Sequence, residues 1–82
     1  MTIEKVLLVE DETLLAQTLA AYLHRNGFEV EIVADGAEVM TRFTLWQPDL
    51  VLLDLMLPNI DGISLCRQIR QFSQTPVIIL TA

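Results

Sequence analysis

Apolar residues along this chain gather in short runs that have the length of β-strands. Residues 5–9, 50–53 and 77–80 are apolar at almost every position, which is typical of strands buried on both faces of a sheet. Residues 28–33 instead alternate between apolar and acidic side chains, which predicts a half-exposed strand at the edge of the sheet. The pattern therefore predicts four strands.

The segments between these strands have the apolar spacing of helices. Helices are predicted over residues 13–26, from Asp35 to about Trp46, and around residues 63–72. Gly27 suits the position after a helix end, Asp35 can cap the second helix, and the proline at position 48 stops it. The positions that mark the three helices are Leu15, Leu19, Tyr22 and Leu23; Ala37, Met40 and Phe43, which we expect to face inward; and Ile63, Leu65, Cys66, Ile69 and Phe72.

Strands and helices alternate along the chain in the order βαβαβαβ. This alternation predicts an α/β fold, a doubly wound parallel sheet with helices on both faces, and 82 residues are enough for one small domain. The last predicted element is an apolar strand with no covering helix after it. We therefore expect residues 1–82 to be the N-terminal part of a domain whose C-terminal elements are missing.

Charge and composition argue against several classes of function. Eleven acidic residues against five basic ones give a net charge of −6. The bases form no cluster, so this piece is not expected to bind DNA directly. No apolar run reaches the roughly 18 residues of a membrane helix, and the first residues lack the pattern of a signal peptide. The single Cys66 cannot form an internal disulfide, which favours a reducing cytoplasm.

Acidic residues directly follow the first and the third predicted strands. Glu10, Asp11 and Glu12 come after the first strand, and Asp54 comes after the third. Parallel strands place these ends at one edge of the sheet, and a crevice opens where the connections of two neighbouring strands leave toward opposite faces. We expect Glu10, Asp11 and Asp54 to converge there. Because carboxylates repel each other, they require a cation or a shared proton, and Mg²⁺ suits such oxygen ligands.

The same crevice would hold the groups that phosphoryl transfer requires. An aspartate beside Mg²⁺, here Asp54, is a competent nucleophile that forms an acyl phosphate. Thr81 ends the fourth predicted strand at the same edge, and its hydroxyl can donate to a phosphoryl oxygen. The residues therefore indicate a phosphoacceptor site that depends on a divalent cation.

Four stretches together resemble the receiver domain of bacterial two-component response regulators, and they span almost the whole chain. They are residues 9–12 (VEDE), 52–58 (LLDLMLP), 61–62 (DG) and 81–82 (TA). The resemblance implies a flavodoxin-like sheet of strand order 2-1-3-4-5, of which this chain lacks the C-terminal α-β-α elements. The stretch that ends at residue 58 is most similar to the subclass whose receivers are joined to winged-helix DNA-binding domains.

The resemblance also implies roles for individual residues. Asp54 would be the phosphoacceptor and would ligate Mg²⁺ together with Asp11 and the backbone carbonyl of Met56. Glu10 would support the metal through a water molecule, and Thr81 would be the switch hydroxyl. A sensor histidine kinase would supply the phosphoryl group, and an output domain outside this chain would bind DNA. The domain itself would not be an enzyme, apart from Mg²⁺-dependent self-phosphorylation and self-dephosphorylation.

The sequence departs from the family pattern in two places. Glu10 stands where many relatives have aspartate. The family also uses a lysine at the end of a fifth strand, and the only lysine here, Lys5, begins the first strand, roughly 17 Å from the acidic edge at ~3.3 Å per residue. A truncated fragment that does not signal is therefore an alternative interpretation. Its apolar residues 77–80 would form an open edge through which copies could pair as a non-native homo-oligomer.

Other interpretations of the same residues stay open. Asp54 can be a polar strand end, and Thr81 can be an ordinary strand residue. Glu12 fits the acidic first turn of a helix better than it fits the metal site. A haloacid-dehalogenase-like phosphohydrolase would also use an aspartyl nucleophile, but it needs a second aspartate two residues later, and Met56 occupies that position.

Overall fold

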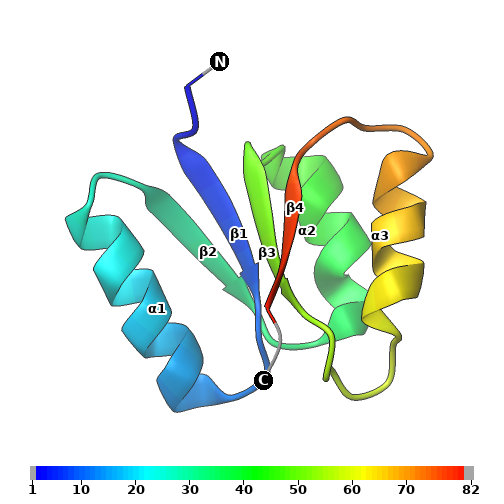
Figure 1. Ribbon diagram of the computed structural model, residues 1–82, viewed down its shortest axis with the longest axis horizontal. Coiled ribbons are helices and arrows are strands. Elements are labelled where there is room, and N and C mark those ends of the chain that lie inside the picture. Colours follow the sequence, from blue (N-terminus) through cyan, green and yellow to red (C-terminus); the bar gives the residue numbers. More distant parts are fainter. Residues whose placement is uncertain (1, 81–82) are drawn as a thin grey trace.

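The computed structural model of the protein describes residues 2–80 and contains one parallel sheet with helices on both faces (Figure 1). Within these residues four strands lie in the order β2-β1-β3-β4, namely β1 (Lys5–Val9), β2 (Glu29–Val33), β3 (Leu50–Asp54) and β4 (Val77–Leu80). The helical elements are α1 (Thr13–Arg25), the short 3₁₀ helix η1 (Gly36–Glu38), α2 (Val39–Trp46) and α3 (Gly62–Arg70). The predicted α/β class with a doubly wound, flavodoxin-like sheet is confirmed.

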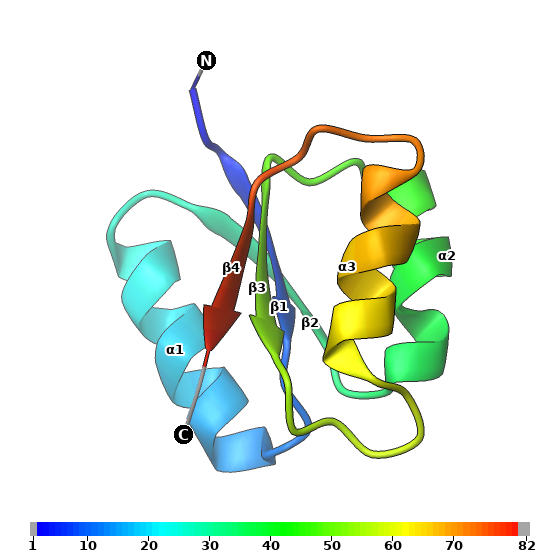
Figure 2. The ribbon, with the colours of Figure 1, turned by 45° about the vertical axis from the view of Figure 1, so that its right-hand side comes forward.

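Three layers make up the fold. Figures 1 and 2 show α1 on one face of the sheet, and α2 and α3 packed together on the other. β1 lies between β2 and β3, with Val6 opposite both Val30 and Leu50. Its four apolar residues are completely buried, so the prediction of a strand covered on both faces is confirmed for β1.

The same prediction is wrong for β3, whereas β4 is partly exposed, as expected for an apolar strand with no covering helix after it. Leu52 is only partly buried, and its neighbour across the ladder, Ile78, is 50% exposed. These two side chains face the α1 side of the sheet, but α1 lies over β1 and β2 (Figure 1). On the opposite face Ile79 is 38% exposed. An unbroken apolar run therefore identified the strands but not how well the described helices cover them.

The main core lies between the sheet and the α2–α3 layer. It is built from alternate residues of the strands and from one side of each helix. Its buried members are Leu7, Val9, Val33, Val39, Phe43, Val51, Leu53, Leu57, Leu65 and Ile69. This core fixes the carboxyl ends of β1 and β3, where the candidate site residues lie.

The second helical segment differs from the prediction at its start. Asp35 accepts a hydrogen bond from the Ala37 amide, as a cap should, but it caps η1, and α2 begins only at Val39. A 3₁₀ helix has about three residues per turn, whereas an α-helix has about 3.6. The α-helical spacing that places Phe43 at the core therefore does not extend back to Ala37, which lies in η1. Met40 and Phe43 do lie at or near the core, whereas Ala37 is exposed and its predicted inward position is wrong.

The third helix is also shorter than predicted. It ends at Arg70, so Phe72 lies beyond it. Phe72 still contacts the core through its ring, which meets that of Phe43 edge-on at a centroid distance of 6.3 Å. In the part of the chain that is described, no helix is long and apolar enough to cross a membrane.

Asp49 ties the starts of β1 and β3 together. Its Oδ2 atom accepts hydrogen bonds of 2.9 Å from the amides of Glu4 and Lys5, and its own amide donates to the Lys5 carbonyl. These two accepted hydrogen bonds lower the pKa of the Asp49 carboxyl below its ordinary value of 3.8. The folded state therefore prefers the ionised form of this group.

We predict that Asp49→Asn lowers the free energy of unfolding and weakens its dependence on acid. Because the folded state lowers the pKa of Asp49, its stabilisation is complete above pH 3.8. It is lost as pH falls through that value toward the lowered one. Urea unfolding at neutral pH and at about pH 3 measures both effects. Glu38→Gln, at an exposed residue, is the control; an acid dependence equally weakened in both variants would contradict the role of Asp49.

Candidate metal centre

The acidic residues meet in a cleft at the carboxyl edge of the sheet. β1 and β3 are neighbours, and the chain leaves them toward α1 on one face and α3 on the other (Figure 2). The cleft has a volume of about 620 Å³. It is lined by Glu10, Asp11, Glu12, Leu15, Leu19, Asp54, Met56 and Leu80.

Three carboxylates of this cleft form a compact cluster. Glu10, Asp11 and Asp54 each offer an oxygen, and these oxygens all lie within 4.8 Å of one another. Glu10 is buried with 4% of its surface exposed, Asp54 is half-buried and Asp11 is exposed. The structure thus brings together the three acids that the sequence predicted to converge. Negative charge at this density needs a compensating cation or a proton.

Glu10 is the most constrained of the three. Its amide donates to the carbonyl of Val33 at the end of β2, and its Oε2 atom accepts from the Glu12 amide at 3.2 Å. Burial raises the pKa of the Glu10 carboxyl above its ordinary value of 4.5, and the nearby carboxylates of Asp54 and Asp11 raise it further. The hydrogen bond from Glu12 acts in the opposite direction but does not cancel the rise. Ionisation of Glu10 is therefore less favourable here than for an ordinary glutamate, and a nearby positive charge would favour it.

Asp54 is held by the loop that follows it. Its Oδ1 atom accepts a hydrogen bond of 2.9 Å from the Met56 amide. This bond fixes the orientation of the Asp54 carboxylate relative to the backbone of residue 56. Met56 lines the cleft while most of its side chain is exposed. Its backbone carbonyl as a metal ligand stays a prediction.

The donor set fits a small hard cation. Mg²⁺ holds oxygen ligands at about 2.0–2.1 Å, so two ligands of one ion lie at most about 4.2 Å apart. The carboxylate oxygens lie within 4.8 Å, so an inward movement of less than about 1 Å, or one bridging water, lets all of them serve one ion. Carboxylate oxygens without any sulfur or imidazole ligand favour hard cations such as Mg²⁺ over softer metals such as Cu(I).

The other predicted site residues have different outcomes. Thr81 lies outside the described residues. Glu12 lines the cleft but does not belong to the three-carboxylate cluster, and its amide, rather than its side chain, supports Glu10. Sequence reasoning did not assign Leu15, Leu19 and Leu80 to the cleft, which they line. In the sequence they only marked a predicted helix and a predicted strand. The position of α1 relative to β4 brings them to the cleft.

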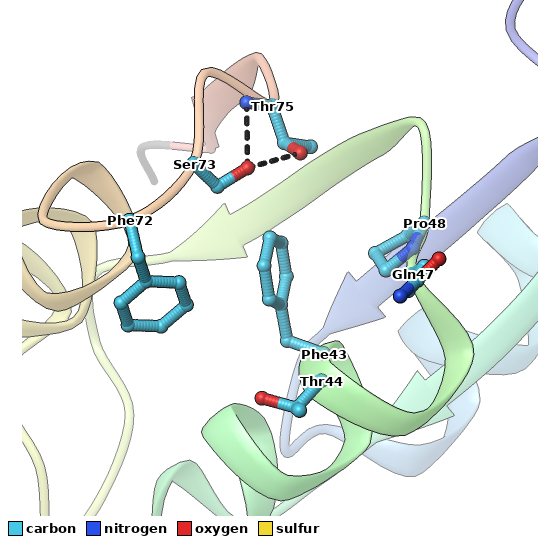
Figure 3. Close-up of a pocket in the computed structure, with 7 residues that line it drawn as sticks. All are labelled: Phe43, Thr44, Gln47, Pro48, Phe72, Ser73 and Thr75. Atoms are coloured by element: carbon cyan, nitrogen blue, oxygen red, sulfur yellow. Dashed lines mark hydrogen bonds between the residues drawn. The ribbon is translucent and has the colours of Figure 1, made fainter.

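A second cavity lies at the opposite edge of the sheet (Figure 3). It has a volume of about 350 Å³ and is lined by Phe43, Thr44, Gln47, Pro48, Phe72, Ser73 and Thr75. Residues 47–48 and 73–75 are followed, after one intervening residue, by the starts of β3 and β4, so this cavity is separated from the acidic cleft by the length of the strands. Its lining carries no charged side chain. It is therefore not a candidate for the metal site.

Relatives of known name match almost the whole chain. A family model described as the response regulator receiver domain matches residues 6–82. The transcriptional regulatory protein YclJ of Bacillus subtilis is 44% identical over 95% of this chain. The DNA-binding response regulator MtrA of Mycobacterium tuberculosis is 42% identical over 96% of the chain. The chain spans only about a third of these relatives, 34% of YclJ and 35% of MtrA.

Solved structures agree with these matches. The BeF3-activated N-terminal receiver domain of Klebsiella pneumoniae RstA superposes with a TM-score of 0.92 at 38% identity, covering 95% of this chain and 67% of that one. The chemotaxis response regulator CheY4 of Vibrio cholerae has a TM-score of 0.87 at 30% identity, covering 95% and 68% of the two chains. From its fold, its acidic cleft and these matches, the chain belongs to the response regulator receiver domain family.

Proposed function

We propose that this chain is the phosphoacceptor module of a two-component response regulator and that Asp54 receives the phosphoryl group with Mg²⁺. The observation that carries the proposal is the cluster of Glu10, Asp11 and Asp54, whose oxygens lie within 4.8 Å of one another beside a cleft of about 620 Å³. The cleft is open to solvent at Asp11, so a phosphodonor can approach Asp54 from outside.

The hydrogen bond from Met56 orients the nucleophile. It engages Oδ1 of Asp54, and we assign attack on the incoming phosphorus to the other carboxylate oxygen, Oδ2. A bond forms between Oδ2 and phosphorus, and the bond from phosphorus to the donor breaks and leaves its electron pair on the donor atom. A bound Mg²⁺ would be held by Asp11 and Asp54, supported by Glu10, and would supply positive charge for the phosphoryl oxygens.

Two-component signalling supplies the partners. A phosphohistidine of a sensor histidine kinase is the proposed donor, in a reducing cytoplasm that suits a chain with a single cysteine. The relatives named as DNA-binding response regulators or transcriptional regulatory proteins support transcription control as the output. This chain has eleven acids and five bases, so we assign contact with DNA to a separate output domain. A phosphohydrolase of haloacid-dehalogenase type is disfavoured because exposed, apolar Met56 offers no general acid.

Metal binding is the first test of the proposal. We predict that Mg²⁺ raises the thermal stability of the protein by mass action. Asp11→Asn and Asp54→Asn should each weaken Mg²⁺ binding by roughly tenfold or more, measured by calorimetry or by titration of backbone amide resonances. Glu12→Gln removes a carboxylate that lines the same cleft outside the cluster and is the matched control. Unchanged Mg²⁺ affinity in both aspartate variants would show that the metal lies elsewhere.

The same titration has an expected pH dependence. Because the pKa of Glu10 is raised, the metal-free fold gains a proton there at a higher pH than an ordinary glutamate does. Mg²⁺ competes with that proton, so Mg²⁺ affinity should begin to fall while pH is still above 4.5. Glu10→Gln should remove this part of the pH dependence and stabilise the metal-free protein at neutral pH.

Phosphorylation of Asp54 is a further prediction. Incubation with Mg²⁺ and a small acyl phosphate should add one phosphoryl group to Asp54, detected by mass spectrometry of the intact protein and of its peptides. Transfer by residues 1–82 should be slow, because a lysine that could neutralise the charge of the phosphoryl group is not near the cleft. The only lysine, Lys5, is the first residue of β1, at the opposite end of the strand from the cleft, and its Nζ atom donates to the Trp46 carbonyl. Asp54→Asn should abolish the product, whereas Glu12→Gln should retain it. A phosphoryl group on serine, threonine or histidine would be inconsistent with the assignment.

We also predict that a polypeptide of residues 1–82 self-associates through β4. Among the described strands β4 has a neighbour on one side only, and Ile78 is 50% exposed; an apolar edge strand is a template for another chain. Sedimentation velocity over a range of concentrations should show a monomer converting to larger species. Ile78→Lys should shift the equilibrium toward monomer, whereas Leu45→Lys, at an exposed residue of α2, should not. A purely monomeric wild type with a cooperative melt would rule this out.

A further inference from the structure

We propose that Gly36 is a positioning residue for the metal centre and that it acts through Ile60. The inference rests on the function proposed above. Gly36 is buried at the start of η1, in the connection between β2 and α2, and it is not a member of the acidic cleft. It contacts the cleft indirectly, through the loop that joins β3 to α3 and carries Met56.

Gly36 is needed for space rather than for backbone freedom. A Cβ atom added to Gly36 would overlap the Cγ2 atom of Ile60 and lie 3.0 Å from its Cβ. Gly27 is the opposite case: its φ of +94° is a conformation that favours glycine, and a Cβ there would meet nothing within 4 Å. Gly36 does not have a left-handed φ, so alanine fits its backbone and only the contact with Ile60 excludes it.

The contact cannot be relieved by the movement of a flexible chain end. Cγ2 of Ile60 is attached directly to its Cβ, and that Cβ is itself close to the added atom. Ile60 is partly buried against the core, and its amide donates to the Pro58 carbonyl at 2.9 Å. Asn59 between them has a φ of 71°, so the turn is tight. A side chain at position 36 must therefore displace the backbone of this loop.

Displacement of the loop reaches the site through Met56. Leu57 is buried in the core directly before the turn, and the Met56 amide holds Oδ1 of Asp54. At the other end of the loop Gly62 approaches Leu55 so closely that a Cβ on it would lie 3.1 Å from the Leu55 Cα. The loop is thus enclosed between η1 and the start of α3. A shift at Ile60 has to be absorbed by residues 55–59, which include the predicted carbonyl ligand.

The test compares four proteins: the wild type, Gly36→Ala, Ile60→Ala and the double variant. Two quantities are measured by backbone NMR, namely the Mg²⁺ dissociation constant and, without metal, the amide shift of Met56. Gly36→Ala should weaken Mg²⁺ binding by roughly tenfold, as second-shell changes do, and should move the Met56 resonance. The double variant should return to within about twofold of Ile60→Ala in affinity. Removal of Cγ2 takes away the overlap, and the remaining contact at 3.0 Å with the Cβ of residue 60 needs a much smaller adjustment.

A purely structural role for Gly36 predicts a different result. Ile69→Val, which trims a buried side chain near the end of α3, is the control for loss of stability alone, and it should leave the affinity of the folded protein unchanged. If folded Gly36→Ala keeps both the wild-type affinity and the wild-type Met56 shift, the proposal is wrong. It is also wrong if Gly36→Ala is equally harmful in the Ile60→Ala background.

The outcomes separate this proposal from the proposed function. If wild type does not bind Mg²⁺, the metal site fails, and the Met56 shifts of the same variants still decide whether Gly36 positions the loop through Ile60. If Gly36→Ala alone does not fold, the double variant is compared with Ile60→Ala. A folded double variant with a matching Met56 shift and affinity supports the contact, and an unfolded one overturns it.

Discussion

Mutual repulsion among three carboxylates is the constraint around which this domain is organised. The parallel ladder between β1 and β3 places Asp54 beside the segment that follows Val9, and Glu10 is buried there with its amide bonded to the end of β2. Burial and, after it, the nearby carboxylates of Asp54 and Asp11 raise the pKa of Glu10. The core between the sheet and the α2–α3 layer has to hold these charges in place, and accordingly Asp54 ends the strand β3 and Glu10 and Asp11 directly follow the buried strand β1.

The strands and helices of this fold could be predicted from the sequence, and so could the convergence of Glu10, Asp11 and Asp54. Two facts were sufficient: apolar runs have the length of strands, and acids follow two of these runs directly. The degree of burial in β3 could not be predicted. Leu8 in β1 is completely buried and Leu52 in β3 is only partly buried, although both belong to unbroken apolar runs, because burial on this face depends on where α1 packs.

Contacts between distant segments were also beyond the sequence. Asp49 was assigned no contact from the sequence, but its carboxylate accepts hydrogen bonds from amides at the start of β1. Gly36 was assigned no role from the sequence, but it lies against a loop that is more than twenty residues away along the chain. Ala37 was misplaced because a 3₁₀ turn precedes α2. For Asp49 and Gly36 the deciding feature is a contact between segments that are distant in the chain, and for Ala37 it is the local type of helix. The spacing of apolar residues specifies neither.

The hydrogen bond between Asp54 and Met56 has a consequence for how phosphorylation could reach the rest of the domain. In the free protein the Met56 amide donates to a charged carboxylate oxygen, and such charge-assisted hydrogen bonds are roughly twice as strong as neutral ones. Once Oδ2 is esterified to phosphorus, Oδ1 becomes the carbonyl oxygen of a mixed anhydride and loses its share of the negative charge. The bond to Met56 weakens without any atom having to move first. Formation of the acyl phosphate would therefore weaken a backbone hydrogen bond at the start of the β3–α3 loop directly, through the change in charge on Oδ1 of Asp54.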